Sequence, residues 1–207
     1  MNTAIKVIGF DADDTLWINE PFFRDSENEF FKLLGEFESA ENINKVLYKT
    51  EMQNLALYGY GTKSFMLSMI ETGLLITNHK ITNQQISRII EIGKNQIEKP
   101  VELLDNIENV LIELSKNYKL ILATKGDLLD QERKLEKSGL SKYFHHIEVM
   151  SDKQPENYHN LIHHLDIMPE EFLMIGNSLK SDILPVIEMG GRGIHVPFHT
   201  TWVHEEV

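Results

Sequence analysis

The sequence of 207 residues contains no cysteine. This absence excludes disulfides, thiolate metal sites and thiol catalysis. No run of about 18 apolar residues occurs, and the first residues, Met1 to Ala4, are not a charged segment leading into an apolar one. The sequence therefore supports neither a membrane span nor a signal peptide. We expect a soluble cytoplasmic protein that has no membrane partner.

Basic residues are scarce as well: 20 Lys and Arg side chains stand against 32 Asp and Glu, for a formal net charge of −12. This charge opposes attraction to nucleic acid or to an anionic membrane face, so we expect no nucleic-acid partner. Any phosphate ligand must then be held by local cations. The hydrophobic content of 42% is enough for one good core and a small second unit.

After Trp17, apolar residues recur at helical spacing for about eighty residues. The pattern predicts an all-helical insert of four helices. Their apolar positions are Phe23, Phe30, Leu34 and Phe37; Val46, Leu47 and Leu55; Phe65, Met66, Met69 and Ile70; and Ile86, Ile89, Ile90 and Ile97.

From Pro100 onward, helices and short apolar strands alternate, which predicts βαβ units and a parallel, doubly wound α/β sheet. The first strand, Lys6–Phe10, should belong to the same sheet. The later strands are expected at Leu120–Ala123, Ile147–Met150, Phe172–Ile175 and Gly193–Val196, and the helices at Ile107–Ser115, Leu129–Lys137, Glu156–His164 and Leu184–Met189.

Polar residues follow four of these strands. The carboxyl ends of parallel strands lie along one edge of a sheet, so we expect these residues to converge there. They are Asp11 and Asp13 after the first strand, Thr124 and Lys125 after the second, Asp152 and Lys153 after the third, and Asn177 and Asp182 after the fourth.

This set of side chains suits phosphoryl transfer. A carboxylate can attack phosphorus, and a second acid can protonate the leaving alkoxide. A divalent cation with oxygen ligands would offset the repulsion between carboxylate and phosphate. A hydroxyl, backbone amides and an ammonium group can bind the non-bridging phosphate oxygens.

Four segments, FDADDTL, LATKGD, SDKQPE and IGNSLKSD, resemble the signature motifs of the haloacid dehalogenase-like (HAD) hydrolases. Most members of that superfamily are magnesium-dependent phosphatases. The resemblance covers nearly the whole chain and implies a Rossmann-like catalytic core of residues 1–16 and 99–207, with residues 17–98 as an inserted helical cap domain. It also implies that Asp11 is the nucleophile, Asp13 the general acid and base, and Thr124 and Lys153 the phosphate binders.

The same resemblance implies a Mg²⁺ site. Its ligands would be the Asp11 carboxylate, the Asp13 backbone carbonyl and the Asn177 side chain, with Asp182 acting directly or through another ligand. The family more often has Asp at position 177, so the neutral amide should bind Mg²⁺ more weakly.

Two further positions depart from the family pattern. Asp14 stands where Gly is frequent, and Asp tolerates unusual backbone angles better than most residues. Lys125 stands where Asn is frequent, which adds a cation near the phosphate or substrate.

Within the predicted cap, two glycines interrupt the helical pattern between Tyr58 and Lys63. We predict a loop that exposes Tyr60 and Lys63 as candidate substrate-binding residues. A simple helix–helix connection is the alternative.

The leading hypothesis is a magnesium-dependent phosphatase that acts on a small phosphorylated metabolite. A 2-haloacid dehalogenase would need neither the second acid nor the metal. A phosphomutase is compatible with the same core residues, and a catalytically weak protein that binds a phosphorylated ligand is favoured by Asn177. The sequence leaves the substrate and the oligomeric state open, a homodimer included.

Overall fold

The computed structural model describes residues 4–205 and 207. Residues 1–3, most of the segment searched for a leader, and residue 206 lie outside the described part. The chain divides into two compact units, Met1–Glu20 with Val101–Val207 and Pro21–Pro100. The division into a core of residues 1–16 and 99–207 and a cap of residues 17–98 stays a prediction. Each unit is described by itself below.

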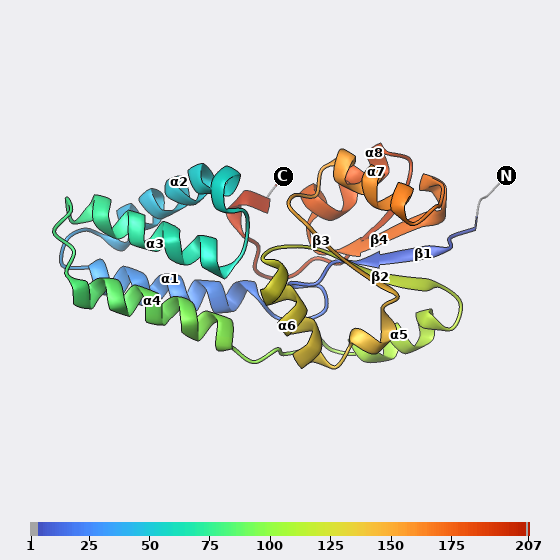
Figure 1. Ribbon diagram of the computed structural model, residues 1–207, viewed down its shortest axis with the longest axis horizontal. Coiled ribbons are helices and arrows are strands. Elements are labelled where there is room, and N and C mark those ends of the chain that lie inside the picture. The colour runs from blue at the N-terminus through green and yellow to red at the C-terminus, as the bar shows by residue number, and fades with distance from the viewer. Residues whose placement is uncertain (1–3, 206) are drawn as a thin grey trace. The chain divides into compact units, whose positions relative to one another are not determined.

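The first unit contains a sheet of five parallel strands in the order β3-β2-β1-β4-β5 (Figure 1). This confirms the predicted doubly wound sheet. The strand order reverses beside β1, and in such sheets ligands bind outside the carboxyl ends of the strands at that point. The strands are β1 Val7–Phe10, β2 Lys119–Lys125, β3 His146–Met150, β4 Phe172–Gly176 and β5 Arg192–His195.

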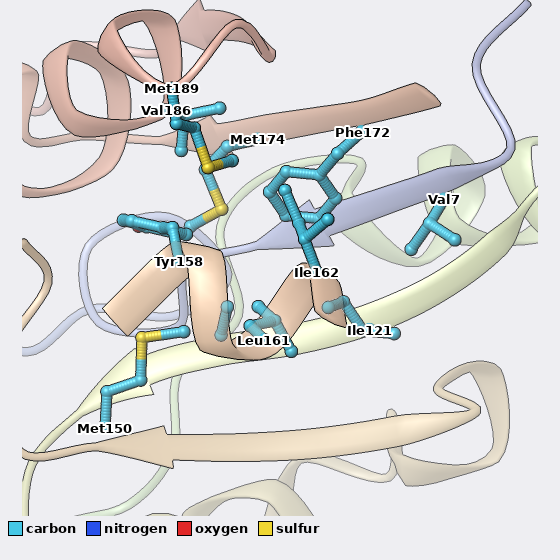
Figure 2. Packing of buried hydrophobic residues seen from close by; sticks show 11 residues of the cluster. Val7, Ile121, Met150, Tyr158, Leu161, Ile162, Phe172, Met174, Val186 and Met189 are labelled. Carbon is cyan, nitrogen blue, oxygen red and sulfur yellow. The ribbon is translucent and has the colours of Figure 1, made fainter. Parts of the chain in front are cut away.

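Alternate residues of the central strand enter two different cores. Val7 belongs to a buried cluster with Tyr158 of α7, which Figure 2 shows in close-up. Ile8 and Phe10 belong to a second cluster, which includes Leu111 of α5. Helices therefore cover both faces of the sheet, as a near-continuous apolar strand requires. These helices are α5 Ile107–Ser115, α6 Leu128–Ser138, α7 Pro155–His164 and α8 Leu184–Glu188.

Short helical turns complete this unit. They include 3₁₀ turns over Ser141–Tyr143, Pro169–Glu171 and Val203–Glu205, and a π-helical turn over Leu179–Ile183. The π-helical turn leads directly into α8 and was not predicted from the sequence.

Helix α6 has clear start and stop signals. The Asp127 side chain accepts a hydrogen bond from the Asp130 amide at 3.1 Å, which caps the first turn. Gly139 ends the helix in the left-handed conformation, with φ 70°. These two signals determine where α6 begins and ends.

The second unit is a helical bundle (Figure 1). Its helices are α1 Glu20–Leu34, α2 Ala40–Tyr58, α3 Thr62–Ile76 and α4 Asn83–Glu98. Each helix contributes two buried residues to one core: Phe30, Leu34, Ile43, Leu47, Phe65, Met69, Ile89 and Ile92. A capping box between Thr82 and Gln85 starts α4.

The predicted loop of this unit is shorter than expected. Tyr58 is the last residue of α2 and Thr62 the first of α3, so Lys63 is helical and was wrongly placed on a loop. Gly59 and Gly61 have φ angles of 69° and 105°, which confine the break to three residues.

Among the described residues, no helix is both long enough and apolar enough to span a membrane.

Candidate active site

Asp11 follows β1 directly and is almost buried, with 7% of its surface exposed. Its amide donates to the Ile175 carbonyl of β4, which holds the backbone at the carboxyl edge of the sheet. One carboxylate oxygen, Oδ1, accepts from Lys153 Nζ at 2.5 Å. The other, Oδ2, lies 3.1 Å from the Thr15 hydroxyl.

Lys153 joins two carboxylates that are far apart in sequence. Its Nζ also donates to Asp182 Oδ1 at 2.6 Å, and both of these side chains are 1% exposed. The second oxygen of Asp182 accepts from the Ser178 amide at 2.9 Å. Asp182 is therefore occupied on both oxygens and orients Lys153 toward Asp11.

The charges of Lys153, Asp11 and Asp182 do not cancel. Burial lowers the pKa of Lys153, but the Asp11 and Asp182 carboxylates raise it well above the usual value, so Lys153 stays protonated. Burial also raises the pKa of Asp11, against the attraction of Lys153. One ammonium group faces two carboxylates, so an additional cation would stabilise the ionised form of Asp11.

Thr15 links Asp11 to the loop after β4. Its hydroxyl accepts from the Asn177 amide at 3.0 Å and lies 3.3 Å from Asn177 Oδ1. Asp11 Oδ2 and Asn177 Oδ1 thus both lie close to the Thr15 hydroxyl oxygen. Such oxygen donors suit a hard divalent cation. In the described part of the chain, no group of three or more His, Cys, Asp or Glu side chains is arranged to hold a metal ion.

Asp13 points toward α6. Its carboxylate accepts from Trp17 Nε1 at 2.7 Å, from Lys134 Nζ at 2.8 Å and from Gln131 Nε2 at 2.9 Å. Burial alone raises the pKa of Asp13, but Lys134 and the hydrogen bonds outweigh it, so this pKa is lowered. Asp13 is therefore an ionised acceptor in this conformation.

Asp14 makes the turn that separates Asp13 from α1. Its φ of 60° is the left-handed conformation anticipated from the sequence. Its carboxylate accepts from the amides of Asn19 and Glu20 at 2.8 Å and 3.0 Å. Asp thus serves this position as well as Gly would, because it also caps the start of the helix.

Thr124 and Lys125 are the last residues of β2 and not, as expected, the first residues after it. Gln131 of α6 donates to the Thr124 hydroxyl at 3.3 Å and to the Lys125 carbonyl at 2.8 Å. The same amide contacts Asp13. Gln131 therefore connects the ends of β1 and β2.

The Lys125 side chain turns toward the loop after β4. Its Nζ donates to Ser181 Oγ at 2.8 Å and to Glu205 Oε1 at 2.6 Å. Glu205 Oε2 accepts from Ser178 and Ser181 at 2.6 Å and 2.5 Å. Burial alone raises the pKa of Glu205, but Lys125 and the two hydroxyls lower it to about 2. Glu205 is therefore a carboxylate at neutral pH.

The structure thus brings most of the predicted residues together at one sheet edge: Asp11, Lys153 and Asp182 in one cluster, Asn177 beside it through Thr15, and Asp13 and Thr124 joined by Gln131. Tyr60 and Lys63 belong to the helical unit, and their role stays a prediction.

Sequence reasoning missed several residues of this edge. Thr15 is part of the FDADDTL motif, so the motif itself could have pointed to this residue. Gln131 and Lys134 sit on the polar side of a helix, where such residues are usually only solvated. Glu205 lies after the last predicted strand, and nothing in its sequence context indicates a partner.

The sequence matches the family of haloacid dehalogenase-like hydrolases over residues 5–190. It is 24% identical to the N-acylneuraminate-9-phosphatase of Mus musculus, in an alignment that covers 98% of this chain and 84% of the mouse protein.

Solved structures are also similar to this chain. A haloacid dehalogenase-like family hydrolase from Xanthomonas campestris superposes with a TM-score of 0.91 at 41% identity, over 96% of this chain and 84% of that one. The HAD-hydrolase YfnB from Bacillus subtilis, bound to magnesium, has a TM-score of 0.66 at 17% identity, over 94% of this chain and 89% of that one. The second likeness concerns the fold alone. On the family match and the 41% identity, the chain belongs to the haloacid dehalogenase-like hydrolases.

Proposed function

We propose that this hydrolase is a magnesium-dependent phosphatase that acts on a small phosphorylated metabolite through an aspartyl-phosphate intermediate. The observation that carries the proposal is the buried Asp11 carboxylate at the end of β1, with the Lys153 ammonium 2.5 Å from one of its oxygens. The likeness to mammalian proteins named N-acylneuraminate-9-phosphatase supports a phosphate ester as the substrate.

In the first step, an oxygen of Asp11 attacks phosphorus, and the bond from phosphorus to the ester oxygen breaks. Lys153 and Thr124 bind non-bridging oxygens of the phosphoryl group and stabilise the charge that develops there. Asp182 is a positioning residue in this step, because its carboxylate holds Lys153 beside Asp11.

Asp13 handles the proton. As an acid it protonates the departing alkoxide, and as a base it then removes a proton from the water that attacks phosphorus. The second step releases inorganic phosphate and restores the Asp11 carboxylate. Because Lys134 and Trp17 stabilise the ionised form of Asp13, the acid role requires these contacts to weaken when substrate binds.

The oxygen donors fit Mg²⁺, which would be held by the Asp11 carboxylate, the Asp13 backbone carbonyl and the Asn177 side chain. When bound, Mg²⁺ supplies positive charge that offsets the repulsion between the carboxylates and the phosphate. Asp182 would act either as a further ligand or through Lys153, which it holds beside Asp11.

The test is hydrolysis of phenyl phosphate by the purified protein, with Mg²⁺ and with a chelator. We expect activity only with the divalent cation. The variant Asp11→Asn should lose this activity, because an amide is a poor nucleophile, whereas the control Asp105→Asn on the exposed surface should keep it.

Undiminished activity in chelator, or an active Asp11→Asn variant, would contradict the mechanism. Chloride release from 2-chloropropionate without added metal, in place of phosphate release, would identify a dehalogenase.

A further inference from the structure

The end of the chain supplies a carboxylate to the functional edge of the sheet. Glu205 belongs to the 3₁₀ turn Val203–Glu205 and is not part of a sheet strand. Both of its carboxylate oxygens are bound: Oε1 by Lys125 Nζ at 2.6 Å, and Oε2 by the hydroxyls of Ser178 and Ser181 at 2.6 Å and 2.5 Å. The side chains of Lys125 and Glu205 are 13% and 14% exposed, so water screens this contact little.

The three donors are also held by contacts that do not involve Glu205. Lys125 Nζ donates to Ser181 Oγ at 2.8 Å, and the Ser181 amide donates to Ser178 Oγ at 3.0 Å. The Ser178 amide is bound in turn to Asp182. An ammonium group and two hydroxyls would therefore stay close to their present positions if Glu205 moved away.

These donors are contiguous with the reacting groups. Ser178 reaches Asp11 through Asp182 and Lys153, in three successive hydrogen bonds. On the other side, Lys125 follows Thr124 in the chain, and its carbonyl accepts from the same Gln131 amide that contacts Asp13. The donors and the reacting groups therefore belong to one hydrogen-bonded network at the carboxyl edge of the sheet.

We propose that Lys125, Ser178 and Ser181 form an anion subsite for a carboxylate group of the substrate, and that Glu205 occupies this subsite when no substrate is bound. This inference rests on the proposed phosphatase function and deepens it, since it names the substrate class as phosphate monoesters that also carry a carboxylate. The two oxygens of Glu205 show the arrangement that a substrate carboxylate would take over.

The test compares matched phosphate esters with and without a carboxylate: phosphoglycolate with ethyl phosphate, 3-phosphoglycerate with glycerol 3-phosphate, and 6-phosphogluconate with glucose 6-phosphate. The decisive pair is the one whose acid has the highest kcat/KM with the wild-type protein. We expect Glu205→Ala to lower the KM of that acid by about fivefold or more, because a tethered competitor acts at millimolar effective concentration. The KM of the partner ester, which lacks the carboxylate, should not change.

Two variants complete the comparison. Lys125→Met should raise the KM of the acid by about tenfold relative to its partner ester, because the charge-assisted contact is lost. Val203→Ala changes an exposed residue of the same turn and should leave the ratio of the two KM values unchanged.

Binding is measured separately by calorimetry in proteins that carry Asp11→Asn, which removes turnover. Tighter binding of the acid, but not of its partner ester, after Glu205→Ala would support the subsite even if no ester is hydrolysed and the phosphatase proposal fails. If Glu205→Ala leaves the affinity for all three acids unchanged, or tightens both members of each pair equally, the inference is overturned and Glu205 only fastens the chain end.

Discussion

A single methyl group at the end of β4 tests how Asp182 holds Lys153. A Cβ atom on Gly176 would lie 2.3 Å from Asp182 Oδ2 and 2.4 Å from Asp182 Cγ. These separations are far below van der Waals contact, so Gly176→Ala must displace the Asp182 side chain. The displaced carboxylate loses its hydrogen bonds to Lys153 and to the Ser178 amide.

The expected cost follows from burial. Lys153 and Asp182 are each 1% exposed, and removing one partner from a buried ion pair costs about 3–5 kcal/mol. Overpacking without a charged group costs about 1–3 kcal/mol. The charge effect should therefore dominate, and the loss is a large part of the roughly 5–15 kcal/mol that stabilises a typical protein.

The assay is urea unfolding followed by tryptophan fluorescence. The two tryptophans, Trp17 and Trp202, both belong to the unit that contains the sheet, so the signal reports that unit. The matched control is Gly191→Ala, whose Cβ would lie 2.7 Å from Val186 Cγ1 and touch no ionised group. We expect the control to lose about 1–3 kcal/mol and to keep its turnover of phenyl phosphate per folded molecule.

Equal losses of stability in Gly176→Ala and the control, with turnover intact in both, would refute the argument. If Gly176→Ala does not fold, Asp182→Asn provides the second measurement, since it keeps the shape and an acceptor oxygen. It should stay folded, because one ammonium group then faces one carboxylate, and it should still lower turnover.

Two further predictions concern Asp13 and its neighbour. Burial raises the pKa of Asp14 from 3.8 to about 7, so the folded state loses stability as pH rises from about 4 through 7. Asp14→Asn cannot ionise, so we expect it to raise the melting temperature at pH 8 but not at pH 4, with a gain in unfolding free energy at pH 8 of at most about 4 kcal/mol; the same change at both pH values would contradict this. Lys134→Met should raise the pKa of Asp13 and thereby move the alkaline limb of the kcat/KM profile for an alkyl phosphate to higher pH by about one to three units. No shift of this limb in Lys134→Met, or an equal shift in the control Lys137→Met, would show that Lys134 does not tune the acid.

Local pattern was sufficient for the order of the elements. Helix α5 begins at Ile107 and ends at Ser115, as predicted, because its apolar spacing and its flanking residues are signals within a few positions of each other. The sheet strands were located for the same reason, since short apolar runs between helices have few other structures available. An unusual backbone conformation at Asp14 was anticipated because Gly is frequent at this position in the family and Asp tolerates such angles.

Local pattern failed where neighbouring structure decides the backbone. The π-helical turn Leu179–Ile183 before α8 carries no distinctive sequence, yet it places Asp182 where one oxygen meets the Ser178 amide and the other meets Lys153. The break between α2 and α3 was predicted from its glycines, but its length was not.

The pairing of side chains at the sheet edge was decided only by the tertiary structure. The sequence placed Asp11, Asp13 and Lys153 at one edge, since parallel strands end there together. It could not indicate that Lys153 bridges Asp11 and Asp182, that Asp13 turns to Lys134, or that Glu205 reaches Lys125. These contacts join residues between 29 and 142 positions apart, and they depend on side-chain rotamers and on the placement of α6 and the chain end. Hydrophobic periodicity indicates which face of an element is buried. It carries no information about the charged residue that a distant segment brings to that element.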